Sequence, residues 1–172
     1  MVLRRTIPAT ASVVKKMNGD RLHSPAAAKN VGHITELVCS VSPKNGTALE
    51  IASGTGQHII KLAAVIPNLT WQPSDIDTAR LNSIVSWSFE KQLPNLLPPI
   101  KLDVTDEGWS ALCPNQDLIL LVNLIHLVSE SEAKVIIDGI SKSLMLGGRC
   151  VIYGPFMRDG FLTSDGDKFF HR

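Results

Sequence analysis

The segment Leu49–His58 reads Leu-Glu-Ile-Ala-Ser-Gly-Thr-Gly-Gln-His, a short apolar run that enters a glycine turn and continues as a helix. Gly54 and Gly56 carry no Cβ, so a turn built on them lets the backbone approach a ligand closely. Asp75 follows Gly56 by 19 residues, at the end of a second apolar run. A carboxylate at about this spacing suits the hydroxyls of a ribose, so the pattern predicts a ligand that contains a nucleoside.

The residues around the turn narrow the kind of nucleoside. A dinucleotide fingerprint needs a small third residue for close helix–strand packing, and here that position is the branched Ile59. The chain also lacks the Gly-x-x-x-x-Gly-Lys-Ser/Thr string of a phosphate-binding loop. Glu50 lies just before the turn, where a carboxylate would repel a pyrophosphate and attract a cation. The pattern therefore favours a cationic nucleoside and disfavours a nicotinamide-dependent oxidoreductase.

Apolar runs and helical periodicities alternate along the chain. Pro67 ends one predicted helix, Asp77 caps the next, and Ser129 with Glu132 forms a capping box for the last. The last helix is expected to end at Gly147 and Gly148. In the helix after Asp77 we expect Leu81, Ile84, Val85 and Phe89 to face inward, and in the last helix Ile137 among others. The predicted helices span 26–41, 57–66, 77–92 and a segment from 129, and the predicted strands span 47–52, 69–74, 100–104, 117–124 and 149–153.

This alternation predicts an α/β fold, a doubly wound, mostly parallel Rossmann-like sheet of about five strands with helices on both faces. Ligands of such sheets bind at the carboxyl ends of the strands. Five candidate residues lie at or near those ends, which supports a single binding site: Glu50, Gly54, Asp75, Asp103 and Asn123.

At these positions the sequence resembles the class I S-adenosylmethionine (SAM)-dependent methyltransferases. Glu50 to Gly56 is similar to their first motif, and Asp75 to the acid of their second. Three strings, Ser24-Pro-Ala-Ala-Ala-Lys-Asn30, Trp71-Gln-Pro-Ser-Asp75 and Tyr153-Gly-Pro-Phe156, resemble more narrowly the methyltransferase-like protein 26 family, whose function is uncharacterised. The resemblance covers about residues 22–166.

The resemblance implies a role for each site residue. Asp75 would hold the ribose and Asp103 the adenine, with Ile76 and Val104 beside the ring, while Asn123 and His126 would face the methyl acceptor as catalytic candidates. The full set expected to bind the cofactor is Glu50, Ser53, Gly54, Thr55, Gly56, Gln57, His58, Asp75, Ile76, Asp103, Val104 and Asn123.

Structural roles remain open for several of these residues. The glycines could only turn a strand into a helix, and Asp103 could be a turn residue. Glu50 could hold the glycine loop through backbone N–H groups or pair with a buried cation. His126 could serve packing and one hydrogen bond.

The function expected from these residues is methyl transfer from SAM to an unidentified small-molecule or protein acceptor. The alternative is a non-catalytic SAM-binding or protein-interaction module. A NAD-dependent oxidoreductase is a third interpretation, which Ile59 disfavours. No metal is expected.

Composition and charge indicate what class of protein this is. The chain has 172 residues, 44% hydrophobic and 19% charged, as expected for one globular domain. A net charge of +1 gives no reason to expect nucleic-acid binding. The longest apolar run, 118–122, is too short to cross a membrane. Three widely spaced cysteines argue against a disulfide framework and favour the cytoplasm.

The two ends of the chain carry separate expectations. Residues 1–22 read as a disordered basic tail, with a mitochondrial transit peptide as the alternative, and 23–172 as the methyltransferase-like domain. The usual C-terminal antiparallel strands of the superfamily are lacking, so the strand 149–153 would be a sheet edge. A shortened isoform, a truncated gene model or a homodimer through this edge would each account for it.

Overall fold

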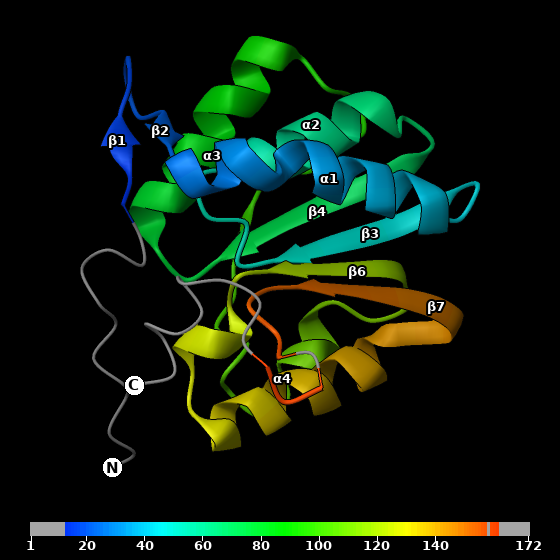
Figure 1. The fold of residues 1–172 in the computed structure, drawn as a ribbon. Coiled ribbons are helices and arrows are strands. Elements are labelled where there is room, and N and C mark those ends of the chain that lie inside the picture. Colours follow the sequence, from blue (N-terminus) through cyan, green and yellow to red (C-terminus); the bar gives the residue numbers. More distant parts are fainter. Residues whose placement is uncertain (1–12, 158, 162–172) are drawn as a thin grey trace.

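A computed structural model describes residues 13–157 and 159–161. Its main sheet has five parallel strands in the order β5-β4-β3-β6-β7 (Figure 1). The chain runs outward from β3 to β5 and then crosses back to β6, so the direction of winding changes between β3 and β6. This confirms the predicted Rossmann-like α/β fold. The strands are β3 (Gly46–Ile51), β4 (Leu69–Asp75), β5 (Ile100–Lys101), β6 (Gln116–Val122) and β7 (Leu144–Tyr153).

Helices cover both faces of this sheet. One face packs against α1 (Pro25–Val41), α2 (Gln57–Val65) and α3 (Thr78–Lys91), and its core contains Ile34, Ile59 and Ile84. The other face packs against α4 (Glu130–Ser143) and a short 3-10 helix η1 (Trp109–Leu112), with Trp109 and Ile136 in its core. A second 3-10 turn, η2 (Ile125–Leu127), follows β6.

Two predicted helix starts are confirmed by their hydrogen bonds. The Asp77 carboxylate accepts from the backbone N–H groups of Ala79 and Arg80 at the start of α3. The Ser129 hydroxyl accepts from Glu132 N–H, and the Glu132 carboxylate accepts from Ser129 N–H, which completes the capping box of α4. These side chains satisfy N–H groups that the first helical turn leaves without partners.

The expected inward faces of α3 and α4 are partly wrong. Val85, Phe89 and Ile137 are exposed, Phe89 to 84% of its surface. The cause in α3 is the polar Ser83, whose hydroxyl donates to Thr55 O and accepts from Leu22 N–H, both at 2.9 Å. These two bonds turn Ser83 inward and therefore rotate Val85 and Phe89 toward solvent.

The expected end of the last helix is also wrong. α4 ends at Ser143, and β7 begins directly at Leu144 instead of after Gly147 and Gly148. The β6–β7 register shifts between Gln116 and Leu118, so residues 145–148 form an irregular bulge before regular pairing starts at Arg149. Gly147 lies in this bulge with φ of 83°, a conformation that glycine adopts without strain.

A small hairpin precedes α1. Its antiparallel strands, β1 (Lys15–Lys16) and β2 (Leu22–His23), lie beside α3 (Figure 1). Trp87 of α3 donates its indole N–H to Leu22 O at 3.2 Å, and the Arg21 guanidinium lies 5.2 Å from the centre of the indole ring. The hairpin overlaps the segment 1–22, which we expected to be a disordered tail, and residues 1–12 of that segment lie outside the described residues.

Among the described residues, no helix combines the length and the apolar character needed to cross a membrane.

Candidate functional site

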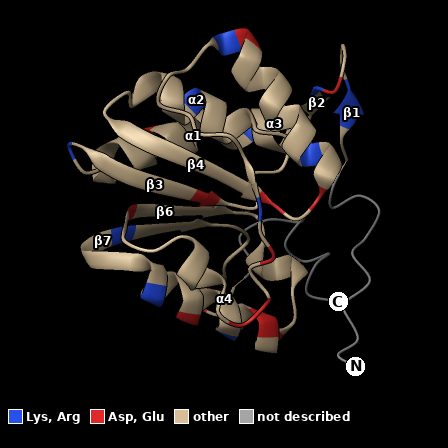
Figure 2. Ribbon diagram, turned by 180° about the vertical axis from the view of Figure 1, so that it is seen from behind, with Lys and Arg blue, Asp and Glu red and all other residues tan. Residues whose placement is uncertain are grey.

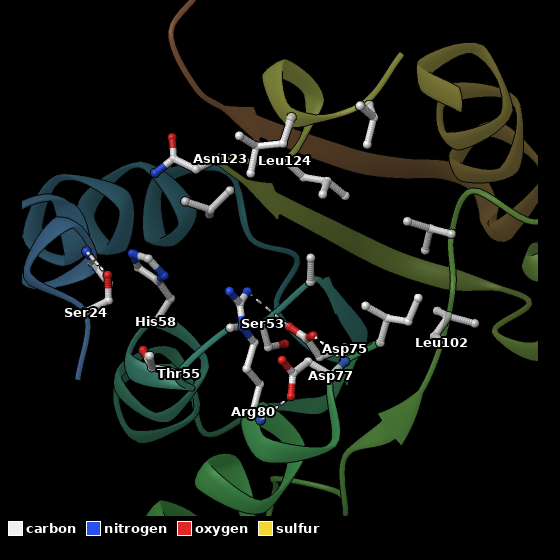
Figure 3. Close-up of a pocket in the computed structure, with 18 of the residues that line it drawn as sticks. Ser24, Ser53, Thr55, His58, Asp75, Asp77, Arg80, Leu102, Asn123 and Leu124 are labelled. Carbon is white, nitrogen blue, oxygen red and sulfur yellow. Dashed lines mark hydrogen bonds and ion pairs between the residues drawn. The ribbon is translucent and has the colours of Figure 1, made fainter. Parts of the chain in front are cut away.

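A cavity of about 380 Å³ lies at the carboxyl ends of the strands. Its walls come from the segments that follow four strands, at 52–55, 75–77, 102–105 and 122–124, and from the start of α1. Figure 3 shows Asn123 and Leu124 on one side of it and Asp75, Asp77 and Arg80 on the other. The cavity lies where the winding of the sheet changes direction, which is the usual ligand position in such folds, and its volume suits a small molecule.

The glycine turn and the end of β4 are tied together at this cavity. Gly54 N–H donates to Asp75 Oδ2 at 2.9 Å, and Ser53 N–H donates to Ser74 O at 2.8 Å. Gly54 has φ of 58°, and a Cβ on it would meet no atom closer than Arg80 Nη1 at 3.9 Å. The space in front of Gly54 is therefore open, and a ligand can approach the backbone there.

Asp75 combines burial with spare hydrogen-bonding capacity. It is only 2% exposed, yet it lines the cavity. Its Oδ2 accepts from Gly54 N–H and its Oδ1 accepts from Asp77 N–H, both at 2.9 Å. A carboxylate oxygen can accept two hydrogen bonds, so each oxygen has capacity for one more, as two neighbouring hydroxyls of a ribose require.

Gly56 and Gln57 do not line the cavity. Gly56 has φ of 89° and lies against α3, where a Cβ would come within 3.0 Å of Ile84 Cγ1. The Gln57 carboxamide oxygen accepts from Ser24 N–H at 2.5 Å and from the Thr55 hydroxyl at 2.8 Å. Gly56 therefore allows helix packing, and Gln57 fastens the start of α1 to the glycine turn.

Glu50 lies outside the cavity wall, and His58 is part of the wall. Glu50 is 1% exposed, and burial raises its pKa from 4.5 to about 8. His58 Nδ1 lies 4.0 Å from Glu50 Oε1, and burial lowers the His58 pKa from 6.5 to about 4. The other ring nitrogen, Nε2, is 2.8 Å from the amide oxygen of Asn30 on α1. Glu50, His58 and Asn30 thus form a buried polar cluster behind the cavity.

The residues expected beside a base gather on one side of the cavity. Asp103 and Val104 line it after β5, and Ile76 lines it after β4 with 47% of its surface exposed. The Asp103 carboxylate accepts from the N–H and the hydroxyl of Thr105, at 3.0 and 2.6 Å. An exposed apolar side chain beside a fixed carboxylate suits a flat base with an exocyclic amino group.

Of the two candidate catalytic residues, Asn123 lines the cavity and His126 does not. Asn123 follows β6 in a left-handed conformation with φ of 55°. Ala52, which follows the neighbouring strand β3, also has a left-handed conformation, with φ of 52°. Backbone strain in non-glycine residues concentrates at functional sites, and both of these residues lie at the cavity. His126 is not among the lining residues, although its neighbours Leu124 and Leu127 are.

The charge of the lining is mainly negative, and Figure 2 shows acidic positions where β4 ends. Of the described residues, the cavity wall includes one guanidinium, that of Arg80, whose Nη1 lies 4.0 Å from Asp75 Oδ2. No three potential ligands in the described part of the chain could hold a metal ion. The carboxylates of the wall are Asp75, Asp77, Asp103 and Glu132.

Sequence reasoning missed part of this wall. Arg80 and Glu132 lie in helix first turns, next to caps that the sequence does reveal, and this position at a strand–helix junction is the signal that could have found them. Ser24 and Val14 come from before the first helix, and only the fold brings them to the cavity.

Residues 21–172 match the family described as "Protein of unknown function (DUF938)". The chain belongs to this family. The match agrees with the resemblance to methyltransferase-like protein 26, and the fold is that of class I SAM-dependent methyltransferases.

Solved methyltransferases share the fold of this DUF938 protein at low sequence identity. An O-methyltransferase family protein from Burkholderia thailandensis has a TM-score of 0.67 and 19% identity, over 81% of this chain and 41% of that one. Coclaurine N-methyltransferase bound to N-methylheliamine and SAH has a TM-score of 0.61 and 16% identity, over 80% and 38%. A glycopeptide N-methyltransferase complexed with SAM has a TM-score of 0.62 and 14% identity, over 72% and 53%. The chain therefore spans about two fifths to one half of these proteins.

Proposed function

We propose that this protein binds SAM in the cavity at the carboxyl ends of its strands and transfers the methyl group to a small-molecule or protein acceptor in the cytoplasm. The observation that carries the proposal is the wall of the cavity, in which four carboxylates and one guanidinium surround an open glycine turn. SAM carries two positive charges and one negative charge, so such a wall attracts it.

The residues present fit the parts of SAM. Asp75 has one acceptor position left on each oxygen for the ribose hydroxyls. Ile76 and Val104 would flank the adenine, and Asp103 would accept from its amino group. The amino-acid part of SAM would lie against Gly54, where a Cβ would fill open space.

Bound SAM would supply an already activated methyl group on its sulfonium. The protein then has to exclude water and align a nucleophile with the methyl carbon, and proximity alone contributes a large part of such a rate increase. Asn123 is the polar residue after β6 that would orient an acceptor, and Leu124 and Leu127 would exclude water beside it.

A binding module without turnover is the second candidate function. The specific observation in its favour is that His126, the candidate base, is not part of the cavity wall. The NAD alternative is disfavoured by the acidic wall, because four carboxylates would repel a pyrophosphate.

Isothermal titration calorimetry of the protein with SAM, with its demethylated product S-adenosylhomocysteine (SAH) and with NAD distinguishes these functions. We expect both adenosyl ligands to bind and NAD not to bind. Transfer of a labelled methyl group from SAM to a component of a cell extract would then distinguish an enzyme from a module. Binding of NAD alone would refute the proposal.

Two matched glycine variants locate the site. Gly54→Ala and Gly19→Ala both place a Cβ on a left-handed glycine with no atom closer than 3.9 Å, so both carry a similar backbone cost of about 1 kcal/mol. We expect only Gly54→Ala to weaken SAM binding, by about tenfold or more, because Gly19 lies in the hairpin turn. Equal effects of the two variants on affinity would place the ligand elsewhere.

A further inference from the structure

The buried polar cluster behind the cavity contains Glu50, whose carboxyl group has too few hydrogen-bond partners to stabilise a negative charge. Glu50 Oε2 is buried and has no hydrogen-bond partner among the described residues. Glu50 Oε1 lies 4.0 Å from His58 Nδ1, which is beyond hydrogen-bond distance. A hydrogen bond with Ser53 lowers the pKa of Glu50, but burial raises it by more. An ionised carboxylate in this place would keep few of the hydrogen bonds that water gives it.

The groups that surround Glu50 do not supply the missing positive charge. His58 faces it from α2, and the neutral Asn30 of α1 lies behind His58. Asp75, at the end of β4, adds a like charge, and Arg80 of α3 is directed at Asp75. On the β6 side, Glu50 pairs in register with the apolar Leu120.

The hydrogen bond to Asn30 fixes where the proton of His58 lies. The amide oxygen of Asn30 can only accept, so His58 Nε2 carries a proton, and in the neutral ring Nδ1, facing Glu50, is then an acceptor. A charged His58 with a charged Glu50 would need close contact to offset the loss of solvation, but the facing atoms lie 4.0 Å apart and Glu50 Oε2 has no hydrogen-bond partner among the described residues. The pair is therefore neutral, with a protonated Glu50 beside a neutral His58. The pKa values agree with this state, because burial raises that of Glu50 and lowers that of His58.

We propose that Glu50 carries a proton in the ligand-free protein and releases it when the positive charge of a ligand reaches the cavity wall at His58. The proton passes from the carboxyl to the solvent, Glu50 becomes a carboxylate, and His58 is neutral before and after. The first half of this inference stands on the buried cluster alone, and the second half rests on the proposed function. Glu50 does not touch the ligand. It is a positioning residue, whose negative charge attracts the ligand from behind the His58 ring.

The size of the release follows from the charge of the ligand. A positive charge within about 4–6 Å lowers the pKa of a carboxyl by about 1–3 units, and a charge beyond the His58 ring lies farther from Glu50 than that, so we expect a fall of about one unit or less. With a starting pKa of about 8, such a fall frees up to about 0.4 proton per ligand at pH 7. Such coupling makes the cavity select for cations, because only a cation gains a buried counter-charge.

Infrared difference spectroscopy tests the first half without any ligand. We expect the wild-type protein at pH 7 to show the carbonyl band of a protonated carboxyl, to lose it as the pH rises past about 8, and to lack it in Glu50→Gln. The control Glu130→Gln removes an exposed carboxyl and should keep the band. Absence of the band from the wild-type protein at pH 7 would overturn the proposal.

Calorimetry with SAM and SAH in two buffers of different ionisation enthalpy tests the second half. We expect the heat of SAM binding to depend on the buffer in the wild-type protein and in Glu130→Gln, and not in Glu50→Gln. The heat of SAH binding should depend less on the buffer, because SAH lacks the sulfonium charge. Binding of SAM to the wild-type protein with the same heat in both buffers would overturn the coupling. If neither ligand binds, the proposed function and the coupling both fail, while the infrared band still assigns the proton to Glu50.

Discussion

Replacing Glu50 with glutamine removes a buried acid while keeping nearly the same side-chain shape. In the wild-type protein burial raises the Glu50 pKa from 4.5 to about 8, so the contribution of this group to stability is fully present below pH 4.5 and is lost as the pH rises through about 8. Burial lowers the His58 pKa from 6.5 to about 4, so the contribution of His58 is present above pH 6.5 and is lost as the pH falls through about 4.

The two dependences cancel in part of the pH range. Between pH 4.5 and 6.5 the folded state gains a proton at Glu50 and lacks one at His58, relative to the unfolded chain. Above pH 6.5 only Glu50 still differs between the two states. The free energy of unfolding should therefore fall between pH 6.5 and pH 8 by about 1 kcal/mol, because one pKa unit corresponds to about 1.4 kcal/mol and Glu50 is half ionised at pH 8.

Urea unfolding at several pH values between 5 and 8.5 measures this fall. We expect Glu50→Gln to lose the decrease above pH 6.5. Its free energy of unfolding should therefore fall less between pH 6 and pH 8 than that of the wild type. Glu130→Gln should retain the decrease, because Glu130 is exposed and its pKa is lowered. Parallel profiles of Glu50→Gln and the wild type would show that Glu50 is already ionised in the folded protein.

Three further predictions concern other parts of the fold. Asp75→Ala leaves two backbone N–H groups without their acceptor. We expect the free energy of unfolding in urea to fall by about 2 kcal/mol and the affinity for SAM in calorimetry to fall at least tenfold. An unchanged unfolding midpoint would contradict the link between β4 and the glycine turn. Gly139→Val places side-chain atoms inside the Trp109 indole, so its thermal unfolding should show a loss of about 3 kcal/mol or more, and a wild-type melting temperature would mean that α4 can move away. The outer edge of β7 predicts a concentration-dependent homodimer in light scattering, which Cys150→Lys should weaken more than Leu146→Lys in the bulge; a wild-type monomer at all concentrations would refute it.

Most of the fold is predictable because local signals mark the ends of its elements. Pro67, Asp77 and the Ser129–Glu132 pair act within one turn of the chain, so the sequence reveals them directly. The start of β7 was not predictable in this way. Leu144 extends at once because it pairs with Gln116, a partner 28 residues away, and such a long-range pairing overrides the local preference for helix.

The sequence also indicated where many residues of the cavity wall lie. Most of them follow strand ends, and the ends of parallel strands meet at one edge of the sheet. The residues that we expected to bind a cofactor and that line the cavity are Ser53, Gly54, Thr55, His58, Asp75, Ile76, Asp103, Val104 and Asn123. The motif itself does not separate Gly54, which faces the cavity, from Gly56, which faces Ile84. That difference depends on how closely α3 approaches α2, and a single sequence does not contain it.

The N-terminal hairpin has a consequence for where this protein begins as a physical unit. The sequence family starts at residue 21, between the two strands of the hairpin, whereas Val14 already belongs to the cavity wall. A cut at that boundary would delete β1 and its pairing with β2, and would remove Val14 from the cavity wall. The smallest piece that keeps the whole wall therefore begins upstream of residue 21.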